Sequence, residues 1–291
     1  MNKSQTLPKI FNRNLLRLHR NRIANDFQNH DFLWREMANR LLERLEFINR
    51  KFPMALDLGA KNGVIAKELQ GRGGIEKLVQ AEFSECLIRN ASGIKIVADE
   101  ELLAFADNSF DLVISVGSLH WVNDLKGTLI QIRRILKPDG LFLGATFGGK
   151  TLHELRASFE KAELEQKGGI SPRISPFIEV RDGGILLQNA GFSLCVADSE
   201  IITAEYTHPL KLMKELRGMG EANALYAGNK NFTPCSLMML AVDNYIKDFS
   251  NEFQRITASF EMVTLTGWKP HSSQQQPAQK GSGVVNLNNI L

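Results

Sequence analysis

The sequence predicts a doubly wound α/β fold with a mostly parallel sheet and helical insertions that cap one end of it. Short, continuously apolar segments alternate with amphipathic helical segments over the first half of the chain, as in repeated βαβ units. The apolar segments lack polar alternation, which is typical of parallel strands covered on both faces. An apolar fraction of 43% in 291 residues is sufficient for a large core.

The predicted elements follow one another regularly up to Phe147. Apolar residues spaced by three and four predict helices over 31–50 and 129–136, and another helix that runs to about Leu69. A turn is expected at 137–140. The predicted strands are 54–56, 77–81, 94–97, 110–115 and 141–145.

The second half of the chain departs from this alternation. Helices are expected over about 151–166, 178–190, 209–221 and 235–249, and strands over about 192–203 and 256–266. We expect the two late strands to extend the sheet edge and the helices between them to cap a pocket. The predicted organisation is a basic N-terminal arm (1–30), an α/β domain (31–268) with helical cap segments at about 151–190 and 205–253, and a polar tail (269–291).

Six basic residues precede the first acidic residue, Asp26. They are Lys3, Lys9, Arg13, Arg17, Arg20 and Arg22. This run is consistent with an arm that contacts an acidic or membrane surface, with a transit peptide, or with a solvated chain end. The net charge of +3 gives no indication of a nucleic-acid partner.

Composition also limits the class of protein. No stretch approaches the roughly 20 apolar residues of a membrane span, so we expect no integral membrane segment, although a peripheral membrane contact is compatible with the basic arm. Three distant cysteines, Cys86, Cys195 and Cys235, predict neither a disulfide framework nor a zinc cluster. None of the six histidines has an acid two positions on, so we predict no metal site. A reducing compartment is expected.

A glycine-containing loop follows the first predicted strand. Ligands of open α/β sheets bind at the carboxyl ends of the strands, where the strand order reverses. Gly59 and Gly63 allow a tight turn there, and Asp57 precedes Gly59 by two positions. An acid at this place suits a ligand with an ammonium group, and the following helix would offer its N-terminus to a carboxylate.

Further acids follow the next two predicted strands. A carboxylate at Glu82 has two oxygens that accept from the hydroxyls of a ribose. Asp99 would accept from an adenine amino group, with Leu102 and Phe105 as walls for the ring. We therefore predict a nucleoside pocket, whose residues are Asp57, Gly59, Ala60, Lys61, Gly63, Glu82, Phe83, Asp99, Glu100 and Ser115.

Four motifs resemble the class I S-adenosylmethionine-dependent methyltransferases, which have a Rossmann-like fold. They span residues 56–59, 98–99, 109–115 and 136–140. The resemblance implies that Asp57, Gly59 and Gly63 hold the methionine part of S-adenosylmethionine, Glu82 its ribose and Asp99 its adenine. Methyl transfer needs mainly positioning. His120, just beyond the fourth predicted strand, is the candidate base, and packing is its alternative role.

Four later segments resemble one branch of that superfamily, the respiratory complex I assembly factor related to the carrier-protein O-methyltransferase of biotin synthesis. They span 118–125, 147–156, 168–177 and 267–271. The resemblance implies modification, by hydroxylation, of an arginine on a complex I subunit, in a bacterial cytoplasm or a mitochondrial matrix. Two alternatives remain, a carrier-protein or small-molecule O-methyltransferase and a non-catalytic assembly chaperone with a weakened pocket.

The sequence departs from the family pattern at two positions of the glycine loop. Lys61 stands where glycine is usual, and Ala60 where cysteine is usual. The side chain of Lys61 would crowd the ligand, point outward, or pair with the cofactor carboxylate. Two other features, the loop 168–177 and the turn 218–221, are expected to form a lid or a protein-binding surface, with Arg156, Arg173 and Lys269 along a groove.

Overall fold

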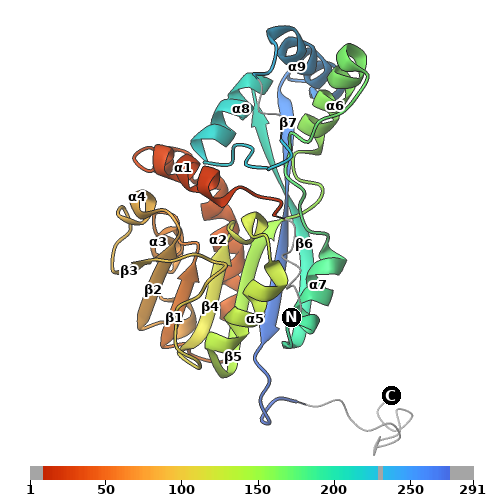
Figure 1. Cartoon of the computed structure of the whole chain (residues 1–291). Helices are drawn as coiled ribbons and strands as arrows, with labels where there is room; N and C mark the ends of the chain where they lie inside the picture. The colour runs from red at the N-terminus through yellow and green to blue at the C-terminus, as the bar shows by residue number, and fades with distance from the viewer. Residues whose placement is uncertain (1–8, 229–231, 276–291) are drawn as a thin grey trace, which may run out of the picture.

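The computed structural model describes residues 9–228 and 232–275, which form a seven-stranded sheet in the order β3-β2-β1-β4-β5-β7-β6 (Figure 1). The strands are β1 (Met54–Leu58), β2 (Lys77–Glu82), β3 (Ile94–Val97), β4 (Phe110–Val116), β5 (Leu136–Phe147), β6 (Ser193–Tyr206) and β7 (Ile256–Trp268). The first five are mutually parallel, and β7 is antiparallel to both β5 and β6. The strand order reverses between β1 and β4, which is the place where such sheets bind ligands.

Helices cover both faces of this sheet. Successive residues of its central strands point to opposite faces, and each face forms an apolar cluster with the helices that cover it. Leu112 and Ile114 of β4 pack toward α2 and α3, whereas Val113 packs toward α5 and α7. The helices are α1 (Arg13–Ile23), α2 (Phe32–Glu43), α3 (Val64–Glu68), α4 (Glu85–Ile88), α5 (Leu125–Ile135), α6 (His153–Lys167), α7 (Val180–Asn189), α8 (Pro209–Gly218) and α9 (Cys235–Phe249). The predicted doubly wound fold is confirmed.

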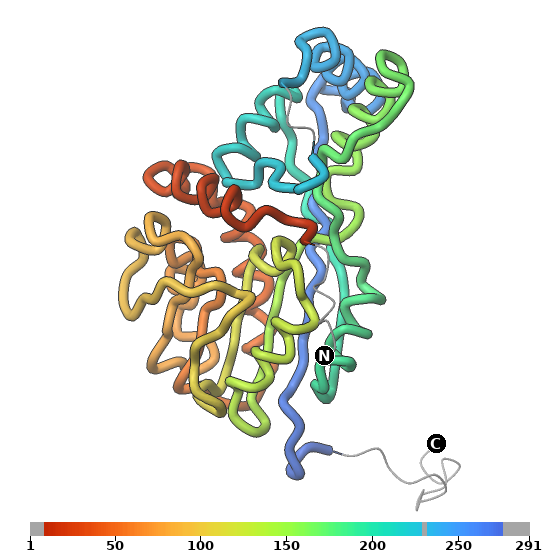
Figure 2. The backbone as a smooth tube through the Cα atoms, viewed as in Figure 1, coloured from red at the N-terminus to blue at the C-terminus, as the bar shows by residue number. Residues whose placement is uncertain are grey.

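The two late strands form a long antiparallel pair that extends past the sheet. β7 pairs with β5 only over Met262–Trp268, whereas its pairing with β6 continues to Ile256. Figure 2 shows α6, α8 and α9 gathered around the free end of this pair, as a second lobe above the sheet. The expectation that the late strands extend the sheet edge is therefore confirmed.

Several predicted boundaries are wrong for local reasons. The helix expected over 31–50 ends at Glu43 and is followed by a 3₁₀ turn over Arg44–Phe47. Residues 137–140, expected as a turn, belong to β5, whose pairing with β4 shifts register between Phe110 and Leu112. The helix expected over 178–190 is α7, which packs on the sheet and not over a pocket.

The N-terminal segment 1–30 is folded in its described part. Residues Arg13–Ile23 form α1, which begins with a cap in which the side chain of Asn12 accepts from the amide of Leu15. Figure 1 shows α1 running across the upper end of the sheet, below α8. In the predicted polar tail 269–291, residues 276–291 lie outside the described part.

Within 9–228 and 232–275, none of the helices combines the length and the apolar character that crossing a bilayer demands.

Candidate cofactor and acceptor site

The ends of the first three strands bring the predicted acids together at the point where the strand order reverses. Asp57 in β1 is 1% exposed, and its Oδ2 has no hydrogen-bond partner among the described residues. Burial, with a smaller effect of the charge of Glu82, raises the pKa of Asp57 well above its usual range. A buried carboxylate without a partner is an incomplete site, which a ligand cation would complete.

The glycine loop after β1 has the backbone that its sequence suggests. Gly59 has φ +81°, and a Cβ at this position would overlap the side chain of Ser118. Gly63, also left-handed with φ +82°, begins α3, which has only five residues. The sequence predicts that the N-terminus of this helix binds a carboxylate of the ligand. A helix of five residues is too short to give a strong dipole, so the structure does not support this prediction.

Arg20 of α1 occupies the centre of the predicted nucleoside pocket. Its Nη1 lies 2.7 Å from Oε1 of Glu82 and 3.1 Å from Oε1 of Glu100. The side chains of Arg20 and of both glutamates are at most 1% exposed. Although burial acts to lower it, the two carboxylates raise the pKa of Arg20 overall, so the guanidinium is firmly charged.

Arg13, two helical turns earlier in α1, holds the neighbouring acids. Its Nη2 lies 2.7 Å from Oδ1 of Asp99 and also pairs with Glu100. Its guanidinium stands 4.4 Å from the ring centroid of Phe83. Burial acts to raise the pKa of Glu100, but Arg13 and Arg20 lower it overall. The three predicted acids Glu82, Asp99 and Glu100 are thus all paired with arginines of α1.

The backbone around Glu82 fixes its carboxylate independently of α1. Oε2 accepts from the amide of Lys61 at 3.0 Å, and Oε1 accepts from the amide of Ser84 at 3.0 Å. Glu82 is therefore positioned by the glycine loop and by its own strand end, and it stays in place whichever group it binds.

Lys61 turns inward, which excludes the outward orientation among the three alternatives for its side chain. It is 2% exposed and has φ +54°. Its Nζ lies 3.6 Å from Oε1 of Glu221 and 5.2 Å from the ring centroid of Trp34. Burial lowers the pKa of Lys61. The lysine that replaces a glycine thus supplies a buried cation to a second group of residues next to the predicted cofactor pocket.

Glu221 joins His120, Trp121 and Lys61 into that second group. Its Oε2 lies 2.9 Å from Nε2 of His120 and accepts from Nε1 of Trp121 at 2.7 Å. Burial acts to raise the pKa of Glu221, but His120 and Lys61 lower it to about 2. Burial lowers the pKa of His120, and its Nδ1 has no partner among the described residues.

A cavity of about 190 Å³ borders this group. Its walls are mainly aromatic and aliphatic, and they include Trp34, Trp121, Phe147 and Phe177. The charged residues of its lining are Glu221, Arg173 and Arg217. The aromatic walls suit a flat side chain with an apolar stem, and Glu221 is the acidic residue among them.

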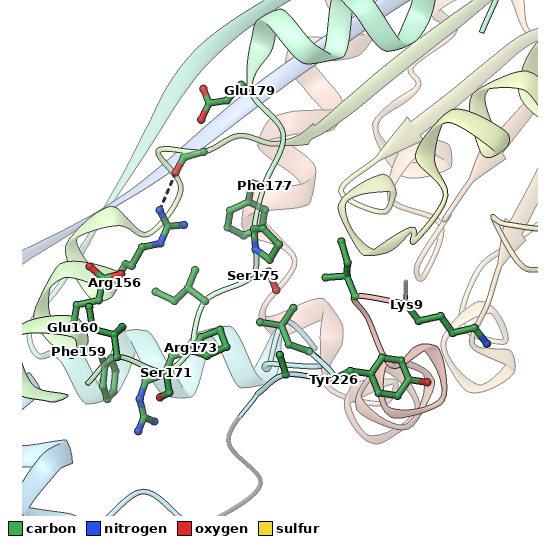
Figure 3. Close-up of a pocket in the computed structure, with 18 residues that line it drawn as sticks. Lys9, Arg156, Phe159, Glu160, Ser171, Arg173, Ser175, Phe177, Glu179 and Tyr226 are labelled. Carbon is green, nitrogen blue, oxygen red and sulfur yellow. Dashed lines mark hydrogen bonds between the residues drawn. The ribbon is translucent and has the colours of Figure 1, made fainter. Parts of the chain in front are cut away.

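A larger groove of about 770 Å³ adjoins this cavity on the outside. Residues 173–175 and Phe177 line both spaces, so this segment is a shared wall. Figure 3 shows Phe177 near the middle, with Arg156 and Glu160 on one side and Lys9 and Tyr226 on the other. The loop 168–177 therefore lines a groove of a size that suits a peptide.

The structure does not place the remaining predicted residues in the positions that the sequence suggests. Ser115 donates to the carbonyl of Leu58 at 2.7 Å, which occupies its hydroxyl between two strands. Leu102, expected beside an adenine, is 74% exposed, and Phe105 packs against Phe110. Lys269 lies away from the groove that Arg156 and Arg173 line, because its Nζ donates to the carbonyl of Leu136 at 2.7 Å.

Sequence reasoning assigned no pocket role to Arg13, Arg20, Trp34, Ser118 or Glu221. In the sequence, Arg20 is one of six basic residues of the N-terminal segment. The signal that could have found it is its spacing of seven residues from Arg13, which places both arginines on one face of α1. Glu221 was part of a turn that sequence reasoning singled out, but no pattern connects it to His120. In the stretches 9–228 and 232–275, no group of three metal-ligating side chains is found.

Comparisons with known proteins identify the family of this chain. The family described as "Methyltransferase domain" matches residues 56–144, which span β1 to β5. The solved structure of the YcgJ protein from Bacillus subtilis superposes with a TM-score of 0.55 at 14% identity, over 80% of this chain and 98% of that one. At that identity the likeness concerns the fold alone. Fold and strand-end acids together define a class I S-adenosylmethionine-dependent methyltransferase.

Two groups of relatives share much more of the sequence. The human "Arginine-hydroxylase NDUFAF5, mitochondrial" is 42% identical over 97% of this chain and 83% of its own length. A "Malonyl-[acyl-carrier protein] O-methyltransferase 1" of Coxiella burnetii is 33% identical over 69% of this chain and 68% of its own. Within the methyltransferase class, the chain belongs to the family of the arginine hydroxylase NDUFAF5.

S-adenosylmethionine is the cofactor of this class. One end of the pocket has a free acidic group for this cofactor, whereas at the other end the acidic groups are already paired. At the methionine end, Asp57 has an unpaired buried oxygen beside the left-handed Gly59. At the adenosine end, Arg20 already uses Glu82 and Glu100. The residues therefore fit the cofactor provided that Arg20 leaves Glu82.

Proposed function

We propose that this chain binds S-adenosylmethionine at the ends of β1, β2 and β3 and modifies an arginine side chain of a protein subunit during assembly of respiratory complex I. The observation that carries the proposal is the aromatic cavity beside Lys61 and Glu221, which adjoins a groove along the loop 168–177. The relationship to NDUFAF5 over 97% of the chain supports the same target residue.

The inner cavity has the chemistry that an arginine side chain needs. A guanidinium stacks on aromatic faces and pairs with a carboxylate, and its three methylenes are apolar. Trp34 and Phe177 would provide faces, and Glu221 the negative charge. The outer groove would hold the peptide around that arginine, because its walls carry both apolar and charged side chains, among them Arg156 and Glu160 (Figure 3).

The residues around the cavity would position and neutralise the reacting side chain. When bound, S-adenosylmethionine supplies an electron-poor carbon on its sulfonium. Asp57 would pair with the ammonium of the cofactor, which replaces the missing partner of its Oδ2. Burial lowers the pKa of His120, and its free Nδ1 would accept a proton from the substrate.

The compartment follows from the partner. The relatives called arginine-hydroxylase NDUFAF5 are named as mitochondrial, and a relative called "Putative methyltransferase RP459" is from the bacterium Rickettsia prowazekii. We place the chain in a bacterial cytoplasm, or in the mitochondrial matrix if its source is eukaryotic, where a complex I subunit would meet it. The pairing of Arg13 and Arg20 with the pocket acids leaves fewer basic residues of α1 for a membrane contact.

Mass spectrometry of complex I subunits from a deletion strain tests the modification. We expect one arginine to lose its modification, and complementation with the wild-type gene to restore it. Complementation with Glu221→Gln should fail, whereas Glu165→Gln, at an exposed position of α6 outside the groove, should succeed. An arginine that is unchanged in the deletion strain would refute the proposal and leave a carrier-protein O-methyltransferase or a non-catalytic chaperone. Assay of malonyl-carrier-protein methylation then separates these two.

A further inference from the structure

We propose that α1 is a built-in competitor of the cofactor, with Arg20 standing where the ribose would be held, so that S-adenosylmethionine binds only when α1 moves off the sheet. The proposal rests on the proposed function, because it concerns the regulation of the same pocket. It adds a regulatory step that the sequence motifs do not contain.

The competition follows from the acceptors that Arg20 uses. Oε1 of Glu82 lies 2.7 Å from Arg20, and Oε2 of the same carboxylate accepts from the amide of Lys61. The hydroxyls of a ribose would need these same oxygens. Arg20 is also 1% exposed, so the volume around its guanidinium is already filled. Side chain and nucleoside cannot share this volume at packing densities typical of protein interiors.

Without the cofactor, the paired state is favoured electrostatically. Glu82 and Glu100 are both fully buried, and two buried carboxylates without a cation are strongly unfavourable. Arg20 pairs with both, and Ser118 donates to Glu100 at 2.5 Å. A bound nucleoside would donate hydrogen bonds to Glu82 in place of Arg20. Arg13 is the first residue of α1, next to the fixed end of the helix, so it would stay paired with Glu100 when the rest of α1 moves.

The attachment of α1 makes its displacement feasible. Most of its apolar contact is with a small cluster of Phe11, Leu16, Trp121 and Ala224 that is separate from the two main cores, and only its last residue, Ile23, packs against the larger core. Moving the helix would therefore expose little apolar surface compared with moving α2. Its C-terminal half is fixed by a polar contact, in which Ser84 donates from Oγ to Oδ1 of Asn21 at 2.6 Å.

The segment before α1 provides a fixed end for such a motion. Phe11 bridges to Leu225, and the amide of Asn12 donates to the carbonyl of Ala224 at 2.8 Å. The amide of Tyr226 donates to the carbonyl of Ile10 at 2.9 Å. Because Ile10, Leu225 and Tyr226 also line the outer groove, the fixed end of α1 adjoins the place proposed for the protein substrate.

Calorimetric titration of the full chain with S-adenosylmethionine tests the competition. The apparent dissociation constant is the intrinsic one divided by the fraction of molecules with α1 displaced. We expect Arg20→Met to bind about tenfold tighter than the wild type. Asn21→Ala removes the polar contact with Ser84 and so loosens α1 without changing a residue of the pocket. This variant should bind severalfold tighter than the wild type. It tests the proposal independently if Arg20→Met does not fold. Arg22→Met, an exposed position of the same helix, is the control and should bind as the wild type does.

Hydrogen exchange of the wild-type chain gives a second readout. We expect saturating S-adenosylmethionine to accelerate amide exchange in residues 15–24. Slower exchange there, or unchanged or weaker binding by both Arg20→Met and Asn21→Ala, would overturn the proposal and make α1 a lid that closes over bound cofactor. Neither measurement involves an acceptor. Tight binding without arginine modification would therefore refute the proposed function alone, and modification with slowed exchange would refute only the competition.

Discussion

The guanidinium of Arg20 lies 2.7 Å from the carboxylate of Glu82, although the two residues are 62 positions apart and come from an N-terminal helix and from β2, the strand next to the sheet edge. Both side chains are almost fully buried. A buried ion pair of this kind contributes less to net stability than its removal costs, because a single substitution leaves the other charge without a partner. The pair therefore links the fold of the N-terminal segment to the state of the pocket.

The first prediction concerns the cost of breaking this pair. Arg20→Ala should lower the free energy of unfolding by about 3–5 kcal/mol, because Glu82 and Glu100 would stay buried with one cation fewer. Urea denaturation measures it. The double variant Arg20→Ala/Glu82→Gln should recover part of the loss, since the amide carries no charge. A loss under about 1 kcal/mol in the single variant would mean that solvent already reaches the pair.

Glu221 gives a prediction on pH. Its pKa in the folded protein is lowered to about 2, from an ordinary value of 4.5. A carboxylate with a lowered folded pKa contributes stability that is complete above the unfolded pKa and is lost as pH falls toward the folded one. The contribution of Glu221 should therefore disappear between about pH 4.5 and pH 2, and it amounts to about 3 kcal/mol at neutral pH.

The comparison with Glu221→Gln isolates this contribution. The free energy of unfolding of the wild type should fall more steeply with acid than that of the variant in the same window. At pH 7 the variant should be less stable, because Lys61 and His120 lose the charge that they face. Parallel pH profiles for the two proteins would contradict the assignment of Glu221 as a buried, charged partner.

Asp57 should have opposite effects on the stability of the fold and on the binding of S-adenosylmethionine. Burial raises its pKa, so its penalty is absent below the unfolded pKa of about 3.8 and grows as pH rises toward the folded value. Asp57→Asn should therefore be more stable than the wild type at pH 7, with little difference at pH 4. The same change should weaken S-adenosylmethionine binding at least tenfold, because the ammonium loses its counter-charge.

Asp111 of β4 serves as the matched control for Asp57. It accepts from the amide of Met54 at 3.0 Å and pairs with Lys137 at 2.9 Å. Asp111→Asn should lower thermal stability and leave cofactor binding unchanged. If Asp57→Asn destabilised the protein as Asp111→Asn does, Asp57 would have a structural partner and would not be an open position for a ligand.

The sequence was sufficient to predict the sheet and the acids at its edge, because each acid lies at the carboxyl end of its strand or within two residues after it. Parallel strands end at one edge, so the positions of Asp57, Glu82 and Asp99 follow from the order of elements alone. The direction of a side chain at that edge is a different matter. Lys61 turns inward because its ammonium pairs with the carboxylate of Glu221 and lies over the ring of Trp34. Both partners come from other elements of the fold, so the local sequence around Lys61 does not indicate them.

The role of α1 could not be predicted for the same reason. A run of basic residues is compatible with solvent, membrane or an internal partner, and only the tertiary position of α1 selects the last. Arg13 and Arg20 face the sheet because the acids of the nucleoside pocket offer the charge that compensates their burial. Local propensity predicts neither that the helix lies across the strand ends nor that it fills the pocket.

Gly117, which follows β4, controls the position of Trp34 and so the wall of the inner cavity. It has φ +56°, and a Cβ there would overlap the indole of Trp34, whose Nε1 donates to the carbonyl of Gly117 at 3.3 Å. Gly117→Ala should therefore cost about 3 kcal/mol of unfolding free energy, from backbone strain and overpacking together. Gly168→Ala, with φ +67° and nothing within 4 Å, carries the backbone strain alone and should cost about 1 kcal/mol. Urea denaturation of both variants measures the difference, and equal losses would show that the indole of Trp34 is free to shift away from Gly117.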